Sequence, residues 1–482
     1  MRMPRTGFRL SGRRDVDMTE GNIARHLVNF ALPLLIGNIF QQFYNTVDTW
    51  VVGNYVSNEA FSAVGTVGPV INMLIGLFGG MSSGASVVIA QYYGAHRNDK
   101  VKEAVHTSAA LTLILCVAFT VIGLLLIQPM LRLMKTPVEV LPESTAYLTI
   151  YFAGMSGLMI YNMGSGILRA VGDSTRPFYF LVVSAVLNIV LDLVFVIAFD
   201  MGVRGVGFAT IIAQGVSALL ISLSLLHSES CVRLRVRDLR INGKMLRKVI
   251  RVGIPAGLQM AITGFSNVFV QSYINFFRTD CMAGYSSYNK LDAFILIPVQ
   301  SLALASSTFV GQNYGARKLE RARQGVKQAL IMSISMTIFL CALLLIFRDQ
   351  LLTLFTNDSL VIQYGSRFIG MIAPFYFCTC FNQTFAGAMR GIGKAKVPMI
   401  VMLSSFVVFR QIFLYVGTKL GGGFVLVSLA YPMGWVVCSI AMYVCYKRSA
   451  LCHPEKAQFA AADTAKDGNT EDAIETADEG IE

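Results

Sequence analysis

Three aspartates stand well inside long apolar runs of this 482-residue sequence: Asp48, Asp192 and Asp292. A carboxylate in hydrocarbon is costly unless it is paired, protonated or hydrated. Such residues are therefore retained mainly in ion pathways, proton relays and ligand sites. The three positions predict a function in which a proton, a cation or a charged ligand is bound away from bulk water.

Polar residues share a helix face with two of these aspartates. Gln41 and Asn45 precede Asp48 by seven and three residues, which places all three on one side of a helix. Asn188 precedes Asp192 by four residues, about one helical turn. Each aspartate therefore has an amide group beside it that can share a ligand or a proton.

Counting residues from the ends of the apolar runs brings Asp48, Asp192 and Thr210 to a similar depth, in the outer half of the membrane. Two carboxylates, an amide and a hydroxyl can hold a proton or a sodium ion, because either one relieves the repulsion between the carboxylates. Asp48 and Asp192 are thus the expected ligands of a sodium ion. The alternative is a structural polar network between helices.

Asp292 and Arg410 lie about equally deep in the second group of apolar runs. On antiparallel helices they can form a fixed salt bridge, or they can contact a substrate in a cavity. Neighbouring aromatic rings can accept an organic cation by cation–π contact, although rings in apolar runs are usually packing residues. These rings belong to Tyr288, Phe294, Phe375, Tyr376, Phe377 and Phe381.

The runs that carry these residues are too apolar for a soluble protein of this length. Of the chain, 54% is hydrophobic and 14% is charged, and the mean hydropathy is +0.58. Runs close to the ~20 residues that cross a bilayer recur throughout. We therefore predict an all-α membrane protein with twelve transmembrane helices. The predicted spans are 27–52, 60–90, 104–127, 144–168, 178–199, 205–227, 250–277, 283–311, 327–347, 365–388, 397–418 and 422–446.

Lysine and arginine test this count, because cytoplasmic connections hold an excess of both. With both termini inside, 31 of the 40 lie in cytoplasmic segments and 6 in outer loops. The sequence thus predicts a multi-pass protein of the plasma (inner) membrane with cytoplasmic N- and C-termini. Its predicted parts are a basic cytoplasmic N-terminal segment (1–25), a first six-helix bundle (26–228), a basic cytoplasmic linker (229–249), a second six-helix bundle (250–447) and an acidic, disordered cytoplasmic tail (448–482).

An internal repeat with an offset of 221 residues relates the two predicted bundles. Because each half has an even number of helices, the halves insert in the same orientation, related by a pseudo-twofold axis along the membrane normal. Two such bundles around a midplane cavity can expose it alternately to either side. The repeat pairs Gln91-Tyr92-Tyr93-Gly94-Ala95 with Gln312-Asn313-Tyr314-Gly315-Ala316, and Arg169, Gly172 and Pro177 with Arg390, Gly393 and Pro398.

Other functional classes fit the sequence less well. The formal charge of +12 is spread over short connections and forms no continuous stripe, which argues against nucleic acid. The nine cysteines have no zinc spacing, and no HExxH, GxSxG or phosphate-loop motif occurs, so we expect no enzyme activity. A repeat that spans the chain argues against a receptor bundle.

Over about residues 20–450 the chain resembles the multidrug and toxic compound extrusion (MATE) transporters. The resemblance implies export of cationic, often aromatic compounds, driven by inward flow of protons or sodium ions. The motifs that carry it are Leu32-Pro33, the stretch Asp48-Thr49-Trp50-Val51-Val52-Gly53, the paired Gln-Tyr-Gly-Ala elements and the connection Arg169-Ala170-Val171-Gly172-Asp173-Ser174-Thr175-Arg176-Pro177.

Carried over by position, the resemblance implies that the coupling residues are Asp48, Asn188, Asp192 and Thr210. It also implies, through spacing alone, that Gln41 and Tyr147 line the cavity. One branch of the family has a glutamate where this chain has Thr263. That departure favours ion coupling in the first half.

We therefore expect a secondary antiporter that exports small organic cations, acts as a monomer among membrane lipids and needs no cofactor beyond its coupling ion, H⁺ or Na⁺. The alternative within transport is a flippase for a lipid-linked oligosaccharide or another amphiphile. A phosphate-binding cavity needs several cations, and only Lys290 and Arg410 are available. The residues expected to line the cavity are Gln41, Asn45, Tyr147, Asp292 and Arg410.

Overall fold

A computed structural model describes residues 15–56, 58–134, 136–277 and 279–453 of the chain. The described residues form helices joined by short connections, with no strand among them. Most of the predicted acidic tail and the first 14 residues of the predicted N-terminal segment lie outside the described residues.

The first half of the chain contains seven α-helices and one π-helical turn among its described residues. Their bounds are α1 (Ile23–Tyr55), α2 (Asn58–Gly94), α3 (Asn98–Leu133), α4 (Leu141–Gly154), α5 (Ser156–Ala170), α6 (Thr175–Leu193), η1 (Val194–Ala198) and α7 (Gly202–Leu226). A short 3₁₀ turn, η2 (Val236–Asp238), lies in the connection to the second half.

The second half repeats this plan with more interruptions. Its elements are α8 (Gly243–Ile274), α9 (Thr279–Gly315), α10 (Leu319–Ile346), α11 (Arg348–Thr353), α12 (Ser359–Ile372), η3 (Ala373–Phe375), α13 (Tyr376–Gly391), α14 (Lys396–Leu403), η4 (Ser404–Phe409), α15 (Arg410–Lys419) and α16 (Phe424–Lys447).

Ten of the described spans are helices long and apolar enough to cross a membrane. The other two predicted spans are interrupted helices, α4 with α5 and α12 with α13. In the second of these the break is a 3₁₀ turn that contains Pro374, whose ring cannot continue the α-helical hydrogen bonding. The twelve-helix membrane fold predicted from the sequence is thereby confirmed.

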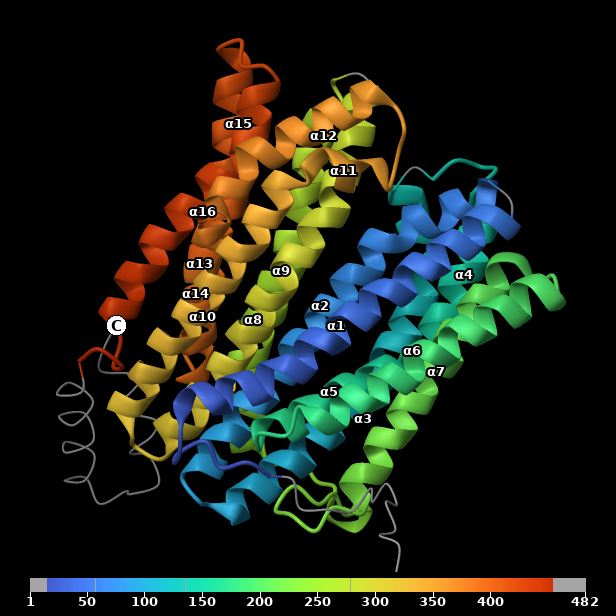
Figure 1. Ribbon diagram of the computed structural model, residues 1–482. Helices are drawn as coiled ribbons and strands as arrows, with labels where there is room; N and C mark the ends of the chain where they lie inside the picture. Colours follow the sequence, from blue (N-terminus) through green and yellow to red (C-terminus); the bar gives the residue numbers. More distant parts are fainter. Residues whose placement is uncertain (1–14, 57, 135, 278, 454–482) are drawn as a thin grey trace, which may run out of the picture.

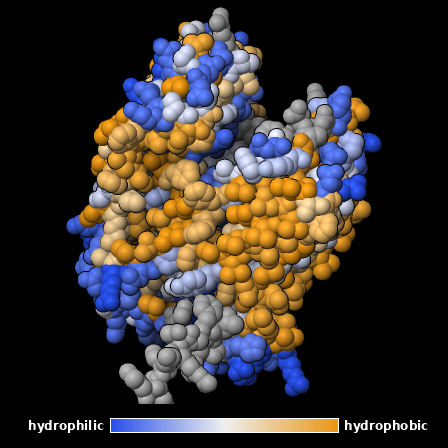
Figure 2. Space-filling view, turned by 45° about the vertical axis from the view of Figure 1, so that its right-hand side comes forward, coloured by the Kyte–Doolittle hydropathy of each residue, from blue (hydrophilic) through white to orange (hydrophobic). Residues whose placement is uncertain are grey.

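The helices form two bundles that meet at one end and separate at the other (Figure 1). The chain enters α1 and leaves α16 toward the end where the bundles meet, which we call the closed end; the opposite end is the open end. In the space-filling view hydrophobic side chains cover most of the flank, and the open end is notched between two lobes (Figure 2).

Helices α2 and α8 make the most extensive contact between the halves. Glycines allow their backbones to touch: a Cβ atom on Gly84 would lie 2.5 Å from the backbone nitrogen of Gly253, and one on Gly80 would overlap the backbone of Gly257. Membrane helices without a hydrophobic driving force between them pack closely through such small residues. This crossing joins the two bundles.

Helix α1 belongs to both bundles. Its first turns pack into a cluster with residues of α9 and α10, such as Leu27 against Phe309 and Ala329. Its last turns pack in the first half, where Val51 and Val52 join the core cluster of α2 to α5. The polar face with Asp48 therefore lies in the part of α1 that is packed in the first bundle.

Candidate functional site

The carboxyl groups of Asp48 on α1 and Asp192 on α6 lie next to each other inside the first bundle. Helices α1 and α6 pack along each other, and each aspartate is about two turns from the end of its helix at the open end. Asp192 is completely buried. The structure thus brings together the two carboxylates that depth counting had placed at one level.

Several polar atoms of this pair have no hydrogen-bond partner among the described residues. They are Oδ1 of Asp48, both carboxylate oxygens of Asp192 and both side-chain amide atoms of Asn188. Asn188 is 2% exposed and precedes Asp192 by one turn of α6. A buried acceptor left without a donor costs about 1–3 kcal/mol. These atoms therefore have unused capacity to bind a proton or a cation.

Two further helices of the first bundle carry the other residues predicted for this site, Tyr147 on α4 and Thr210 on α7. Thr210 lies on α7, which packs against α6, and its hydroxyl donates to the carbonyl oxygen of Val206 at 2.9 Å. That bond uses the only hydroxyl proton, so the Thr210 oxygen can act toward any other group only as an acceptor. Tyr147 on α4 interacts electrostatically with both carboxylates and is 6% exposed.

Two residues of this site were not predicted from the sequence. Tyr44 lies one turn before Asp48 on α1 and interacts with its carboxylate. Tyr151 stacks on Tyr147 with ring centroids 6.3 Å apart. The signal was present in the four-residue spacing of Tyr44 to Asp48 and of Tyr147 to Tyr151, which puts each pair on one helix face.

The other two α1 residues expected in the cavity lie toward the closed end from Asp48. Gln41 contacts the phenol of Tyr44. Asn45 has an exposed side chain. Gln41 lies two turns and Asn45 one turn before Asp48 on α1.

In the second bundle, Asp292 on α9 is held by two tyrosines. Tyr288, one turn earlier on the same helix, donates its hydroxyl to Oδ1 at 3.2 Å, and Tyr376 at the start of α13 donates to the same oxygen. The two hydroxyls also lie 3.2 Å apart. Unlike the first-half pair, this carboxylate is satisfied by neutral donors.

The salt bridge between Asp292 and Arg410 that equal depth had made possible does not form. Within the described chain Arg410 has no carboxylate partner; its guanidinium donates to Ser266 Oγ at 2.6 Å and to Asn267 Oδ1 at 3.0 Å. Tyr285 and Tyr431 lie near both charged groups and interact electrostatically with each. Their hydroxyl groups share a hydrogen bond of 2.5 Å. Depth counting fixes the height of a residue but not its direction around the helix axis.

Arg410 is 2% exposed and its Nε has no hydrogen-bond partner among the described atoms. Its guanidinium carbon lies 4.9 Å from the ring centroid of Tyr431, a cation–π distance. Thr263 donates its hydroxyl to the carbonyl of Gln259 in its own helix at 2.7 Å. Arg410 is thus a buried cation stabilised by an aromatic face and neutral acceptors.

A π-helical turn adjoins a buried charge in each half. η1 begins two residues after Asp192, and η4 ends immediately before Arg410. Such turns are rare and are found frequently at functional sites. Each turn changes the rotation of the helix next to the charged residue and therefore the direction in which that side chain points.

The closed end is built from the repeated Gln-Tyr-Gly-Ala elements, which press against each other; we call this contact the seam. A Cβ atom on Gly94 would overlap the carbonyl of Gln312, and one on Gly315 would overlap the carbonyl of Gln91. The glutamine side chains donate hydrogen bonds across the seam. Gln91 donates to the carbonyl of Gly391 at 2.8 Å, and Gln312 donates to the carbonyl of Ala170 at 2.9 Å. All these partners are equivalent under the 221-residue offset.

A family model, MatE, matches residues 33–194 and again residues 255–416 of the chain. The two matches fall in the two halves related by the repeat, and together they cover more than half of the sequence.

Named relatives match over most of their length. The probable multidrug resistance protein YoeA of Bacillus subtilis (strain 168) is 28% identical over 449 residues, which cover 89% of this chain and 94% of the relative. A protein named FAD transporter from Shewanella oneidensis is 24% identical over 446 residues, 91% of this chain and 97% of the relative.

A solved structure described as the outward-facing conformation of a multidrug resistance MATE family transporter is similar throughout. It superposes with a TM-score of 0.86 at 26% identity and covers 91% of this chain and 98% of the other. The fold and the two-bundle arrangement are therefore those of that group of membrane proteins.

Proposed function

The chain belongs to the MATE family of multidrug transporters, and we propose that it exports organic cations in exchange for protons or sodium ions. Members of this family are transporters and not enzymes. The observation that carries the proposal is the contact between the carboxyl groups of Asp48 and Asp192, in which Oδ1 of Asp48 and both oxygens of Asp192 have no hydrogen-bond partner among the described residues.

Charge balance explains why this pair can couple two fluxes. Two adjacent carboxylates in a buried site repel each other unless one proton or one cation lies between them. A small ion and a positively charged substrate can both provide that charge, so binding one removes the reason to bind the other. Exchange of the ion for the substrate follows if each is released on a different side of the membrane.

Both a proton and a sodium ion fit the chemistry of the donors. Asp48 and Asp192 offer carboxylate oxygens, Asn188 an amide oxygen and Thr210 a hydroxyl oxygen. Hard cations are bound by oxygen ligands of these kinds. Because the same oxygens also accept a proton, only a transport assay separates the two ions.

The orientation of the chain is part of the proposal. The lysine and arginine distribution favours cytoplasmic termini, and the chain enters α1 and leaves α16 toward the closed end. The structure then corresponds to a state that is open to the outside and closed to the cytoplasm. Its similarity to a structure described as outward-facing supports this assignment.

Uptake into inverted membrane vesicles tests the function. We expect a fluorescent organic cation to accumulate when either a pH gradient or a sodium gradient is imposed, and to leak out when that gradient is collapsed. A cation that accumulates under neither gradient, in vesicles that contain folded protein, contradicts the antiport assignment. The ion whose gradient drives uptake is the coupling ion.

A second prediction concerns Asp292, which we propose contacts the substrate rather than the coupling ion. Asp292→Asn is expected to raise the KM for a cationic substrate about tenfold, because a charge–charge attraction worth about 1.4 kcal/mol is lost. The dependence of the rate on the ion gradient is expected to stay as in the wild type. Tyr376→Phe, which removes one donor to Asp292, should change KM by less.

The control is Asp349→Asn, since Asp349 is an exposed aspartate of α11. It should leave KM unchanged. An unchanged KM for several cations in Asp292→Asn, or loss of gradient dependence in that variant, removes Asp292 from the substrate cavity.

A flippase for a lipid-linked oligosaccharide or another amphiphile is the second candidate, and the buried guanidinium of Arg410 is the observation in its favour. Anionic cargo is also suggested by the name of the FAD transporter among the relatives. One buried arginine with an unpartnered Nε is a small site for a phosphate. Retention of cation transport in Arg410→Gln together with loss of lipid translocation would favour this alternative.

A further inference from the structure

The described residues ahead of α1 make specific contacts with the rest of the protein. Residues 15–20, which we call the strap, lie against the seam at the closed end. Met18 is 1% exposed and Thr19 is 2% exposed. A polar segment next to a basic terminus would be expected to stay hydrated, so its burial requires specific partners.

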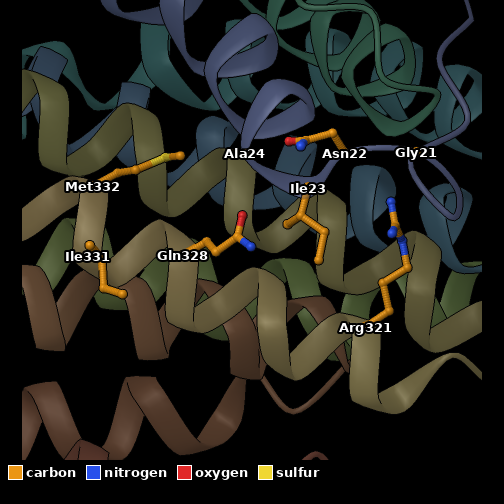
Figure 3. A pocket seen from close by; sticks show the side chains of 8 residues that line it. All are labelled: Gly21, Asn22, Ile23, Ala24, Arg321, Gln328, Ile331 and Met332. Atoms are coloured by element: carbon orange, nitrogen blue, oxygen red, sulfur yellow. The ribbon is translucent and has the colours of Figure 1, made fainter.

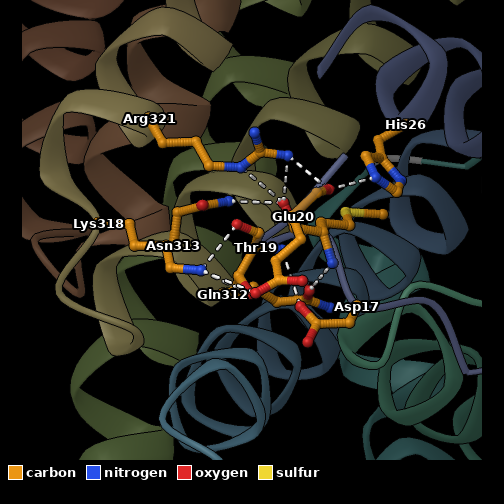
Figure 4. A network of polar contacts seen from close by, with 9 residues as sticks. Asp17, Thr19, Glu20, His26, Gln312, Asn313, Lys318 and Arg321 are labelled. Atoms are coloured by element: carbon orange, nitrogen blue, oxygen red, sulfur yellow. Dashed lines mark hydrogen bonds and ion pairs between the residues drawn. The ribbon is translucent and has the colours of Figure 1, made fainter. Parts of the chain in front are cut away.

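Most of those partners belong to the second half (Figure 4). The backbone nitrogen of Met18 donates to Gln312 Oε1 at 2.9 Å, and its carbonyl accepts from Asn313 at 3.2 Å and from Arg321 at 3.1 Å. Lys318 donates to the carbonyl of Thr19 at 3.1 Å. The Met18 side chain lies in the same cluster as residues of α9 and α10.

Glu20 continues this attachment. Its carbonyl accepts from Arg321 Nη2 at 2.7 Å, and its carboxylate lies 3.6 Å from Lys318 Nζ. One guanidinium therefore holds two carbonyl groups of the strap, those of Met18 and Glu20. Hydrogen bonds with a charged partner are stronger than neutral ones.

The strap makes fewer contacts with the first half. The backbone nitrogen of Val16 donates to the carbonyl of Val171 at 2.9 Å, and Asp15 lies 3.8 Å from Arg176 in an ion pair. The backbones approach closely here, because a Cβ atom on Gly172 would lie 2.5 Å from the carbonyl oxygen of Val16. Val171 lies in the connection between α5 and α6, and Arg176 lies in the first turn of α6.

The first turns of α8 and the residue just ahead of it make the reciprocal contact with the first half. Lys248 Nζ donates to the hydroxyl of Tyr92 at 3.2 Å, and the backbone nitrogen of Asn242 donates to Thr107 at 3.3 Å. Tyr92 and Asn313 are equivalent under the repeat. Each half is thus held by the segment that leads into the other half.

We infer that the strap is a latch: it holds the closed end shut, and when that end opens it stays attached to the second half and separates from the first. This inference rests on the proposed alternating access. The asymmetry of the contacts supports the direction of release, since the second half holds the strap through Gln312, Asn313, Lys318 and Arg321, and the first half through Val171 and Arg176.

The junction between the strap and α1 has room to move. Gly21 has a φ of +76°, a conformation that side chains other than glycine rarely adopt. A cavity of about 400 Å³ lies between the start of α1 and α10, lined by Gly21, Asn22, Ile23 and Ala24 on one side and by Arg321, Gln328, Ile331 and Met332 on the other (Figure 3). The first turn of α1 therefore borders open space on one side, while Ile23 and Leu27 stay packed against α9 and α10.

Distances between spin labels on the full-length protein test the latch. Labels on Asn98→Cys in the first half and Lys327→Cys in the second report opening of the closed end, because both side chains are exposed near it. The half-buried Cys231, Cys445 and Cys452 are replaced by serine. Wild-type protein should show a short distance that lengthens in a fraction of molecules when substrate or ion conditions change.

Asp15→Asn is expected to raise the ratio of open to closed molecules about fivefold, since it weakens the buried ion pair with Arg176 that breaks on opening. The matched control is Glu20→Gln in the same strap, whose carboxylate lies beside Lys318 of the second half, a contact that persists on opening. It should leave the ratio unchanged. Thermal unfolding of both variants identifies any general loss of stability.

A label on Asp17→Cys, an exposed strap residue, tests the direction of release. On opening, its distance to the Lys327 label should stay constant, and its distance to the Asn98 label should lengthen. The reverse pattern, or equal ratios in Asp15→Asn and Glu20→Gln, overturns the latch while transport stands. A single distance in the wild type under every gradient contradicts alternating access itself.

Discussion

Asp48→Asn and Asp192→Asn should each lower gradient-driven uptake of an organic cation about 100-fold, at the upper end of typical coupling free energies. Each variant leaves one carboxylate beside a neutral amide, so the repulsion that makes the site take up a second positive charge is gone. Uptake into vesicles with an imposed pH or sodium gradient measures the loss.

The two variants should remain folded in the membrane, because an amide has nearly the shape of the carboxylate and can donate to the unpartnered oxygens of the neighbouring residue. Their thermal unfolding is expected to match or exceed that of the wild type. Asp99→Asn is the matched control, since the Asp99 side chain is 67% exposed. Normal coupled uptake in both Asp48→Asn and Asp192→Asn would remove the carboxylate pair from the mechanism.

Gly94→Ala and Gly315→Ala should open the seam. In the structure an added Cβ atom at either position overlaps the backbone of the facing Gln-Tyr-Gly-Ala element, and backbone cannot move aside as a side chain can. Overpacking of this kind costs about 1–3 kcal/mol. We expect a lower unfolding temperature, a larger open fraction at the closed end and at least a tenfold fall in transport.

Gly215→Ala provides the comparison for these variants, because Gly215 also lies inside a helix but has no atom within 4 Å of the added Cβ. That substitution should be neutral or slightly stabilising. If Gly94→Ala transports and unfolds like Gly215→Ala, the two elements do not press together in the membrane as described.

The helix positions could be predicted because the apolar runs are long and charged residues lie at their ends. The predicted span 27–52 became Ile23–Tyr55, and 104–127 became Asn98–Leu133. The observed helices are longer because their backbone hydrogen bonding continues into polar residues at both ends. A prediction from hydropathy ends each span where the apolar run ends. The break at α12 and α13 was missed because Pro374 lies within a continuous apolar run.

The meeting of Asp48 and Asp192 followed from sequence because each stands a similar number of residues from the open end of its helix and α1 packs on α6. The same method was wrong for a salt bridge between Asp292 and Arg410, since height alone does not set the direction of a side chain. Whether the first-half residues couple an ion stays a prediction that the variants above test.

The strap could not be predicted at all. Its local sequence is polar and has no periodic apolar face, and its burial arises from partners about 300 residues away, such as Gln312 and Arg321. Contacts of that kind depend on the assembled halves. The count of lysines and arginines that predicted the topology treats Arg321 only as a positive charge. In the structure its guanidinium binds backbone carbonyl groups.

The symmetry of the seam bears on how a chain of this design can arise. Gln91 meets the carbonyl of Gly391 as Gln312 meets that of Ala170, so the contact is isologous, with the same patch on each partner. A six-helix chain that carried this patch once could close the same contact by forming a homodimer. Fusion of two copies would then preserve the dimer interface inside one polypeptide and free each copy to specialise, as the carboxylate pair in one half and the buried arginine in the other illustrate.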